Sequence, residues 1–216
     1  MGSFTASDGL TIQYTSDGSG PPVVLVHGVG ADKESWDEVA RRLSGRFSIV
    51  RADLRGHGGS GRISTCSMDD FVSDLDGLCE AAGLSRFHLA GFSLGGLIAQ
   101  HYALRRPERI DRLALISTVA QRTDAERARV RERGDVLARD GIAAVTDAAE
   151  DRWFTPAFKA ANPERVAQRL RQLRANDHAS YTAAYRVFAE ADEGIDIAAI
   201  AAPTLVVTGE NDQGSN

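Results

Sequence analysis

Short apolar runs alternate along this chain with longer segments in which apolar residues recur every three or four positions. Continuous short runs are typical of strands covered on both faces, and the longer spacing is typical of helices. Residues 4–16 alternate loosely around a turn at Asp8-Gly9 and predict a β-hairpin. Further strands are predicted at 23–26, 47–50, 87–90, 110–116 and 203–208.

Helical spacing fills the segments between these strands. It begins near Ser35, again at Ser67, where Asp70 completes a capping-box pattern, and again directly after Ser93. Strands that alternate with helices predict an α/β fold with a doubly wound, mostly parallel sheet.

Between residues 119 and 200 the pattern changes, and every segment has helical spacing. The predicted helices are 124–140, 142–150, 163–175 and 178–190. This stretch is too long for a simple crossover between strands. We interpret it as a helical cap inserted over the carboxyl ends of the strands, where open α/β sheets bind ligands.

Composition narrows the classes of protein that fit. The 216 residues, 43% hydrophobic and 25% charged with a net charge of −5, fit one globular domain over 1–216. No basic cluster is present, which argues against nucleic acid as a partner. No run approaches the ~18 apolar residues of a membrane span, and no secretory signal is visible, so we expect a cytoplasmic protein. Cys66 and Cys79 form neither a disulfide framework nor a metal-ligand spacing.

The most informative stretch is Gly91-Phe92-Ser93-Leu94-Gly95, which lies between a predicted strand and a predicted helix. This G-x-S-x-G pattern places a serine on a turn so tight that its neighbours must be small, and Gly91 and Gly95 meet that need. The turn exposes the hydroxyl of Ser93. It also directs the N–H of Leu94 and the positive end of the following helix toward whatever Ser93 attacks.

Together with three other motifs, this turn resembles the α/β-hydrolase family. The other motifs are His27-Gly28-Val29-Gly30 after the first buried strand, the run from Asp53 to Ser60 after the next, and the run from Gly209 to Asp212 after a late strand. The order and spacing of all four match the family. More narrowly, the chain is similar to 3-oxoadipate enol-lactonases and related small carboxylic ester hydrolases.

The resemblance implies roles for particular residues. Ser93 would be the nucleophile and Asp212 the acid that orients the catalytic base. The oxyanion hole would consist of the backbone N–H groups of Val29 and Leu94. The supporting turns would contain His27, Gly28, Gly30, Gly91 and Gly95. The chemistry needs no metal and no cofactor.

The family's catalytic histidine lies beyond the acid, after one more strand, whereas this sequence ends at Asn216. We therefore expect a domain that lacks the last strand and helix and is inactive alone in a routine ester assay. The expected source of that part is a longer polypeptide or a second chain. The chain's own histidines are expected to serve structure and packing or to face solvent, and these are His27, His57, His88, His101 and His178.

The expected function is hydrolysis of a small carboxylic ester or lactone through a Ser93 acyl-enzyme. Two alternatives remain open at this point. One is C–C bond hydrolysis or perhydrolase chemistry at the same site, and the other is a non-catalytic ligand-binding protein on this fold. Six arginines from Arg122 to Arg139 are matched by five acids and predict a solvated helix face. If the substrate were a carboxylate, an arginine of the cap could bind it, although the sequence does not indicate which one.

Overall fold

The structure is a computed structural model that describes residues 1–212. Seven strands form one sheet in the order β1-β2-β4-β3-β5-β6-β7. β1 and β2 form the predicted hairpin, β2 also pairs antiparallel with β4, and the remaining strands run parallel. The predicted doubly wound, mostly parallel sheet is thus confirmed. The strands are β1 Gly2–Thr5, β2 Thr11–Asp17, β3 Pro22–Val26, β4 Ser48–Ala52, β5 Phe87–Phe92, β6 Ile110–Ile116 and β7 Thr204–Val207.

The helices follow the predicted spacing with one addition. They are α1 Asp37–Leu43, α2 Met68–Ala81, α3 Leu94–Arg105, α4 Asp124–Asp140, α5 Ile142–Trp153, α6 Pro156–Ala161, α7 Pro163–Arg174 and α8 His178–Glu190. Short 3₁₀ turns lie at Lys33–Trp36, Pro107–Arg109 and Ile197–Ala199. The sequence pattern missed α6 because this helix buries no side chain and therefore carries no apolar periodicity. The predicted capping box of α2 is present.

The two faces of the sheet are covered by different helices. Alternate residues of β3 point to opposite faces, so Val23 and Leu25 pack with α1 whereas Val24 and Val26 pack with α2 and α3. The larger core lies on the α2–α3 side and continues into the cap through residues such as Leu173. Cys79 is fully buried in that core, where a free cysteine packs as a small apolar side chain.

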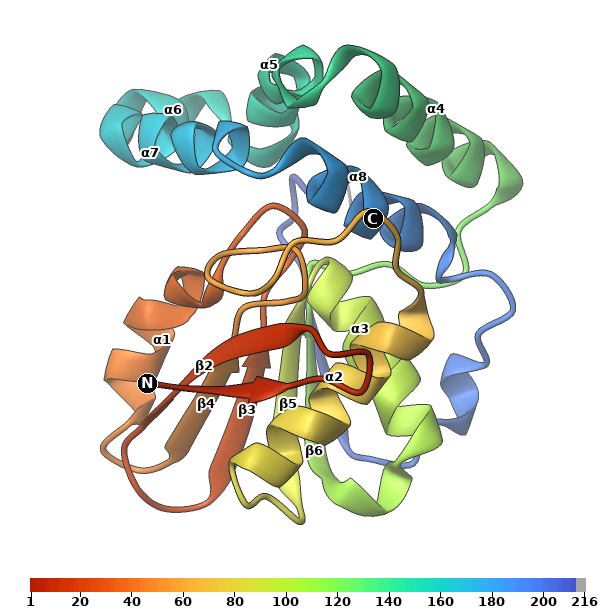
Figure 1. Cartoon of the computed structure of the whole chain (residues 1–216). Helices are drawn as coiled ribbons and strands as arrows, with labels where there is room; N and C mark the ends of the chain where they lie inside the picture. Colours follow the sequence, from red (N-terminus) through yellow and green to blue (C-terminus); the bar gives the residue numbers. More distant parts are fainter. Residues whose placement is uncertain (213–216) are drawn as a thin grey trace.

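Helices α4–α8 lie between β6 and β7 in the chain, within the region that we call the cap, residues 119–200. Figure 1 shows them stacked above the sheet, with α8 nearest to it. The cap therefore lies on the side of the sheet where β5 ends and α3 begins.

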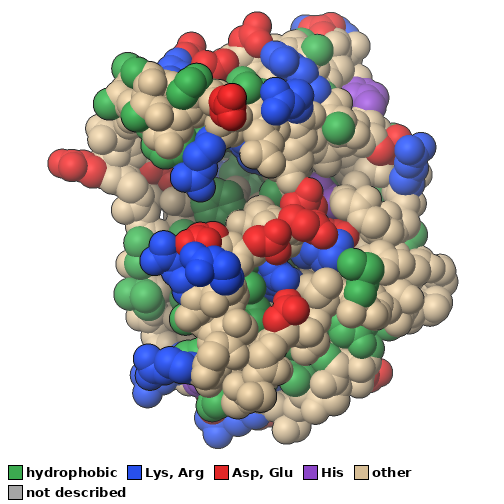
Figure 2. Space-filling model, turned by 90° about the vertical axis from the view of Figure 1, so that its left-hand side faces the viewer, with side chains coloured by type: hydrophobic (Ala, Val, Ile, Leu, Met, Phe, Trp, Pro, Cys, Tyr) green, Lys and Arg blue, Asp and Glu red, His purple; other side chains and the backbone are tan. Residues whose placement is uncertain are grey.

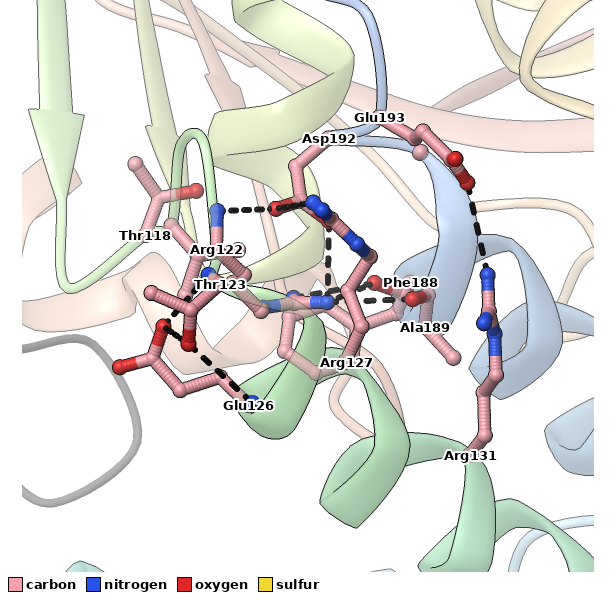
Figure 3. Close-up of polar contacts among 12 residues, drawn as sticks. Thr118, Arg122, Thr123, Glu126, Arg127, Arg131, Phe188, Ala189, Asp192 and Glu193 are labelled. Carbon is pink, nitrogen blue, oxygen red and sulfur yellow. Dashed lines mark hydrogen bonds and ion pairs between the residues drawn. The ribbon is translucent and has the colours of Figure 1, made fainter.

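A buried ion pair joins the start of the cap to its end. The backbone N–H of Arg122 donates to Asp192 Oδ2 at 2.7 Å, and Nη1 donates to Oδ1 at 3.1 Å. The guanidinium also donates to the carbonyl oxygens of Phe188 and Ala189, and it lies 4.6 Å from the centre of the Phe188 ring (Figure 3). The prediction of a solvated arginine face is therefore wrong for Arg122, because this residue precedes α4 and turns toward α8 instead of lying on an exposed helix face.

At the far edge of the described sheet, β7 is exposed along its whole length. Leu205 and Val206 retain 60% and 69% of their surface, which is high for apolar strand residues. None of the helices within residues 1–212 combines the length and the apolar character needed to cross a membrane.

Candidate active site

The turn between β5 and α3 holds Ser93 in an unusual backbone conformation. Its φ is 54°, a region that residues with a Cβ rarely occupy. A Cβ on Gly91 would lie 2.1 Å from the carbonyl oxygen of Gly95, and a Cβ on Gly95 would lie 2.3 Å from that of Val26. Both glycines are thus required by the close approach of backbone to backbone, which is the steric reason the sequence pattern predicts.

Several hydrogen bonds keep Ser93 in this position. Its N–H donates to the carbonyl of Ile116 at 3.0 Å, and its own carbonyl accepts from the Thr118 hydroxyl at 2.7 Å. Thr118 also occupies the space that a Cβ on Gly96 would need. The turn is therefore fixed by the end of the neighbouring strand β6, which leaves the Ser93 side chain partly exposed.

The loop after β3 lies directly against the serine. A Cβ on Gly28 would be 3.0 Å from Ser93 Cβ, so Gly28 permits the close approach. Gly30 has a φ of 69°, and a Cβ there would overlap the Tyr181 ring of α8. Within residues 1–212 the N–H groups of Val29 and Leu94 are assigned no hydrogen-bond acceptor. Two backbone donors are thus available near Ser93, although the side chain of Leu94 is buried in the core.

Two buried histidines hold residues 27–30 to the loop after β4, and we call residues 27–30 the oxyanion loop after the role that the resemblance implies for them. His27 Nε2 accepts from the Leu54 N–H at 2.9 Å, and His57 Nε2 accepts from the Gly30 N–H at 3.0 Å. Each Nδ1 faces a carbonyl oxygen, that of Gly28 at 2.8 Å and that of Arg55 at 3.0 Å. These contacts define the neutral Nδ1–H tautomer for both rings. Both side chains are therefore structural, as the sequence analysis expects.

The environment keeps both rings uncharged. Burial lowers the pKa of His27 to about 4, and this outweighs the opposing effect of its hydrogen bond to Gly28. Burial, with the nearby His27 ring, lowers the pKa of His57 to about 3. The ring centroids lie 5.3 Å apart. A protonated ring would lose its Nε2 acceptor and would oppose the other ring, so neither is suited to act as a general base.

The cap contacts the oxyanion loop directly, which the sequence pattern did not reveal. Arg169 of α7 donates through Nη1 to the Gly30 carbonyl at 2.8 Å, and Asn176 donates to the same oxygen at 3.2 Å. Gln172 hydrogen-bonds the carboxylate of Asp32 just beyond the loop. These residues lie about 140 positions from the loop in sequence, as the spacings of 139 and 146 show, so no local motif could have identified the contact.

A cavity of about 680 Å³ opens over Ser93. Val29 and Asp212 line it together with Ser93, and its other walls come mainly from the cap. The cap residues that line it are Arg133, Asp151, Arg152, Trp153, Phe154, Thr155, Pro156, Arg169, Tyr181, Tyr185 and Phe188. Figure 2 shows a hollow with hydrophobic side chains inside and both basic and acidic side chains around its rim. Trp153 and Phe154 line the cavity, whereas Trp36 is buried in the core beside α1.

Asp212 is placed by the loop that follows β7. Its N–H donates to the Gly209 carbonyl at 3.0 Å, and the Thr208 hydroxyl donates to its Oδ2 at 3.4 Å. The fold therefore brings a carboxylate from the late strand to the cavity that contains the serine.

All five histidines of the chain lie within the described residues, and the cavity lining includes none of them. His101 Nε2 lies 2.6 Å from the carbonyl of Ala191, the residue that follows α8, and His178 is exposed at the start of α8. His88 lies in β5 with its ring against Phe47. Residues 1–212 also contain no cluster of three or more side chains arranged to hold a metal ion.

Comparison with known proteins agrees with this geometry. The family model described as alpha/beta hydrolase fold matches residues 21–215. An (E)-2-((N-methylformamido)methylene)succinate hydrolase of Acinetobacter baylyi is 32% identical over 213 residues, which are 97% of this chain and 79% of the relative. The 3-oxoadipate enol-lactonase 2 of the same organism is 26% identical over 212 residues, or 97% of this chain and 78% of the relative.

Solved structures give the same result. The crystal structure of the enol-lactonase from Burkholderia xenovorans LB400 superposes with a TM-score of 0.89 at 28% identity, and it covers 97% of this chain and 81% of that chain. A thermophilic esterase from Thermogutta terrifontis gives a TM-score of 0.86 at 27% identity, over 96% and 79% of the two chains. The chain therefore belongs to the α/β-hydrolase family, and it is a hydrolase.

Proposed function

We propose that this hydrolase cleaves a small carboxylic ester or lactone through an acyl-enzyme on Ser93. The observation that carries the proposal is the serine itself. It stands on a turn with a φ of 54°, at the floor of a cavity that Val29 and Asp212 also line. The names of the relatives, which include enol-lactonases and an esterase, support the ester or lactone class.

In this reaction the Ser93 oxygen attacks the carbonyl carbon of the substrate while a base accepts the hydroxyl proton. The carbonyl oxygen becomes an anion that the N–H groups of Val29 and Leu94 stabilise. The carbonyl then re-forms, the bond to the leaving oxygen breaks, and the base returns its proton to that oxygen. Water hydrolyses the resulting Ser93 ester in the same way. Each oxyanion donor typically contributes about 3–4 kcal/mol to transition-state stabilisation.

The base is proposed to be an imidazole that Asp212 orients. Because no histidine of residues 1–212 lines the cavity, we infer that this imidazole comes from outside these residues, either in the same polypeptide or in a second chain. In this proposal the nucleophile, the oxyanion donors and the orienting acid belong to the described part of the chain, and only the imidazole does not.

Labelling with a fluorophosphonate tests the proposal on the natural polypeptide that carries this sequence. We expect a covalent adduct on the peptide that contains Ser93, together with hydrolysis of p-nitrophenyl acetate. Ser93→Ala should abolish both, with a loss of turnover on the order of a million-fold.

Ser117→Ala is the matched control, since Ser117 also lines the cavity but does not stand on the turn. It should retain the adduct and most of the turnover. An adduct on another residue, or turnover that survives Ser93→Ala, would refute the proposal.

A further inference from the structure

Three aromatic side chains of α8 form a row along one wall of the cavity. The ring centroids of Tyr181 and Tyr185 lie 6.1 Å apart, and those of Tyr185 and Phe188 lie 5.8 Å apart. All three residues line the space above Ser93. Side chains spaced three and four residues apart share one face of a helix, so the row follows the axis of α8. We call Tyr181, Tyr185 and Phe188 the α8 row.

The first ring of the α8 row rests on the oxyanion loop. A Cβ on Gly30 would lie 2.5 Å from Tyr181 Cε2, so the ring and the loop are in close contact. The preceding residue, Val29, carries one of the two proposed oxyanion donors. An acyl chain that runs along the row from a carbonyl held there would meet Tyr181 first, and only a longer chain would reach Phe188.

Arg122 holds the last ring of the row. Its guanidinium carbon lies 4.6 Å from the centre of the Phe188 ring. Nη1 and Nη2 donate to the Phe188 carbonyl at 3.1 and 3.0 Å, and Nη1 also donates to the Ala189 carbonyl at 3.2 Å. These carbonyls belong to the last turn of α8, where acceptors lack partners inside the helix and favour a cation. Arg122 thus contacts both the ring and the backbone of Phe188 (Figure 3).

Asp192 fixes the guanidinium of Arg122 in turn. Its carboxylate is fully buried and accepts from the backbone N–H and from Nη1 of Arg122 at 2.7 and 3.1 Å. A buried charge pair with several hydrogen bonds has a defined geometry, because displacement leaves a buried charge without its partner. The position of the Phe188 ring is therefore set by polar contacts as well as by packing. Arg122 is not among the described residues that line the cavity, so it acts on the cavity through Phe188.

We propose that Arg122 is a positioning residue for selectivity, which acts through Phe188 and makes the enzyme prefer esters whose acyl chain reaches that ring. This inference rests on the proposed function, because the acyl chain is the part of the substrate that becomes bound to Ser93. The chain lies along the α8 row, and Phe188 covers its far end. Each methylene that is fully buried there favours the longer ester by about four-fold.

Hydrolysis of two esters tests the proposal on the natural polypeptide. p-Nitrophenyl acetate and p-nitrophenyl hexanoate share the leaving group and differ only in the length of the acyl chain. The measured quantity is the selectivity ratio, which is kcat/KM for the hexanoate divided by kcat/KM for the acetate. We expect a ratio of about ten or more in the unaltered protein, because the longer chain is buried against the α8 row.

Arg122→Lys is the variant that tests the positioning role. Lysine keeps a positive charge beside Asp192, but it has no planar fork that can bind two carbonyl groups and a carboxylate at once. It should lower the selectivity ratio about five-fold through the hexanoate and change kcat/KM for the acetate by less than about two-fold. Phe188→Ala should lower the ratio at least as much. The double variant should have the ratio of Phe188→Ala alone, because Arg122 acts through that ring.

Arg131→Lys is the matched control. Arg131 belongs to α4 and pairs with Glu193 at 3.4 Å, so this ion pair also joins α4 to the segment that follows α8. Both side chains keep half or more of their surface, and surface ion pairs contribute little. Arg131→Lys should therefore leave the selectivity ratio unchanged.

The outcomes separate this inference from the proposed function. A ratio near one in the unaltered protein, or the same ratio in Arg122→Lys, would overturn the positioning role. Hydrolysis that survives Ser93→Ala would instead overturn the serine mechanism. Isothermal titration calorimetry of the two esters with Ser93→Ala should show the same preference for the hexanoate without turnover, so the selectivity can be measured whether or not the serine mechanism holds.

Asp192→Asn provides a second test should Arg122→Lys not fold. The amide removes the charge that holds the guanidinium and has nearly the same shape as the carboxylate. The selectivity ratio should fall in the same direction as in Arg122→Lys. An unchanged ratio in Asp192→Asn would contradict the role assigned to the Arg122 contact.

Discussion

At the scale of single residues, the site depends on backbone strain at Ser93 and on the absence of side chains around it. A positive φ at a residue with a Cβ costs on the order of 1–3 kcal/mol, and it persists only where neighbouring contacts enforce it. Here Ile116 and Thr118 supply those contacts, and Gly91 and Gly95 leave the space that the turn requires. The strain directs the hydroxyl into the cavity instead of into the helix.

A substitution at Gly28 tests how closely the oxyanion loop must approach the serine. A Cβ there would lie 3.0 Å from both Ser93 Cβ and Phe92 Cδ1. We expect Gly28→Val to push the loop away and lower kcat for p-nitrophenyl acetate about a hundred-fold, since misaligned donors lose most of their contribution. The fold should survive, because the conflict lies at the cavity and not in the core.

Gly45→Val is the matched control, since nothing lies within 4 Å of a Cβ at that position. Far-ultraviolet circular dichroism of both variants checks the fold. If Gly28→Val retained full turnover, Val29 would not be an oxyanion donor.

Individual residues differ in how well the sequence predicts them. The tight turn at Ser93 follows from a local pattern, because its steric demands fall on residues two positions away. The contact of Arg169 with the oxyanion loop does not follow from any local pattern, because it depends on where α7 packs. Arg122 shows the same limit, since its sequence neighbourhood suggests solvent whereas the fold pairs it with Asp192.

At the scale of elements, hydrogen bonds join the cap to the oxyanion loop. Helix α7 and the turn after it supply two donors to the Gly30 carbonyl, from Arg169 and Asn176. The N–H on the other side of Gly30 is held by His57. The two peptide groups that flank Gly30 are therefore fixed, one from the cap and the other from the loop after β4.

The contact of Arg169 leads to a prediction about rate. Arg169→Met should lower kcat for p-nitrophenyl acetate about ten-fold, because the loop loses a charge-assisted hydrogen bond, while KM changes little. Arg169→Lys should recover part of the rate, which a merely space-filling role would not explain.

Arg165→Met serves as the control for Arg169→Met, since Arg165 is an exposed residue of the same helix. An equal effect of both variants, or an effect on KM alone, would argue against a positioning role for Arg169.

Elements with a strong apolar period were predictable, and those without one were not. The parallel strands and α2 follow from continuous apolar runs and from a capping box. Helix α6 has six residues and no buried side chain, so its formation depends on the Thr155 cap and Pro156 and not on periodicity. The predicted boundaries of the cap follow from the change in sequence pattern at residues 119 and 200. The packing of the cap helices against one another cannot be predicted from that pattern.

At the scale of the whole molecule, stability is linked to pH through the buried histidine pair. In the unfolded chain each imidazole has a pKa near 6.5, whereas in the fold the pKa falls to about 4 for His27 and about 3 for His57. Lys33 and Arg169 near His27 oppose its protonation, and Asp53 favours it, but burial is the largest effect. The folded state therefore takes up these two protons only at much lower pH than the unfolded state.

Whether the free energy of unfolding rises or falls with pH depends on which state, folded or unfolded, binds more protons. Above pH 6.5 both states hold neutral rings, and the stabilisation from neutral burial is complete. Between pH 6.5 and about 4 the unfolded chain binds protons that the fold excludes, so the free energy of unfolding decreases as the pH falls. Each histidine contributes a slope of about 1.4 kcal/mol per pH unit in that window.

Urea unfolding at several pH values between 7 and 4 measures this slope, and a variant isolates the part that belongs to His57. In His57→Gln the amide can still accept from Gly30 and donate to Arg55 but cannot titrate. The free energy of unfolding should therefore depend less steeply on pH, by about 1.4 kcal/mol per unit, whatever the variant costs at pH 7. A slope that is the same in His57→Gln and in the unaltered chain would mean that the fold does not lower the pKa of His57, and this would contradict the neutral, buried ring that accepts from Gly30. Because the two proteins differ only at residue 57, the difference between their slopes carries the result.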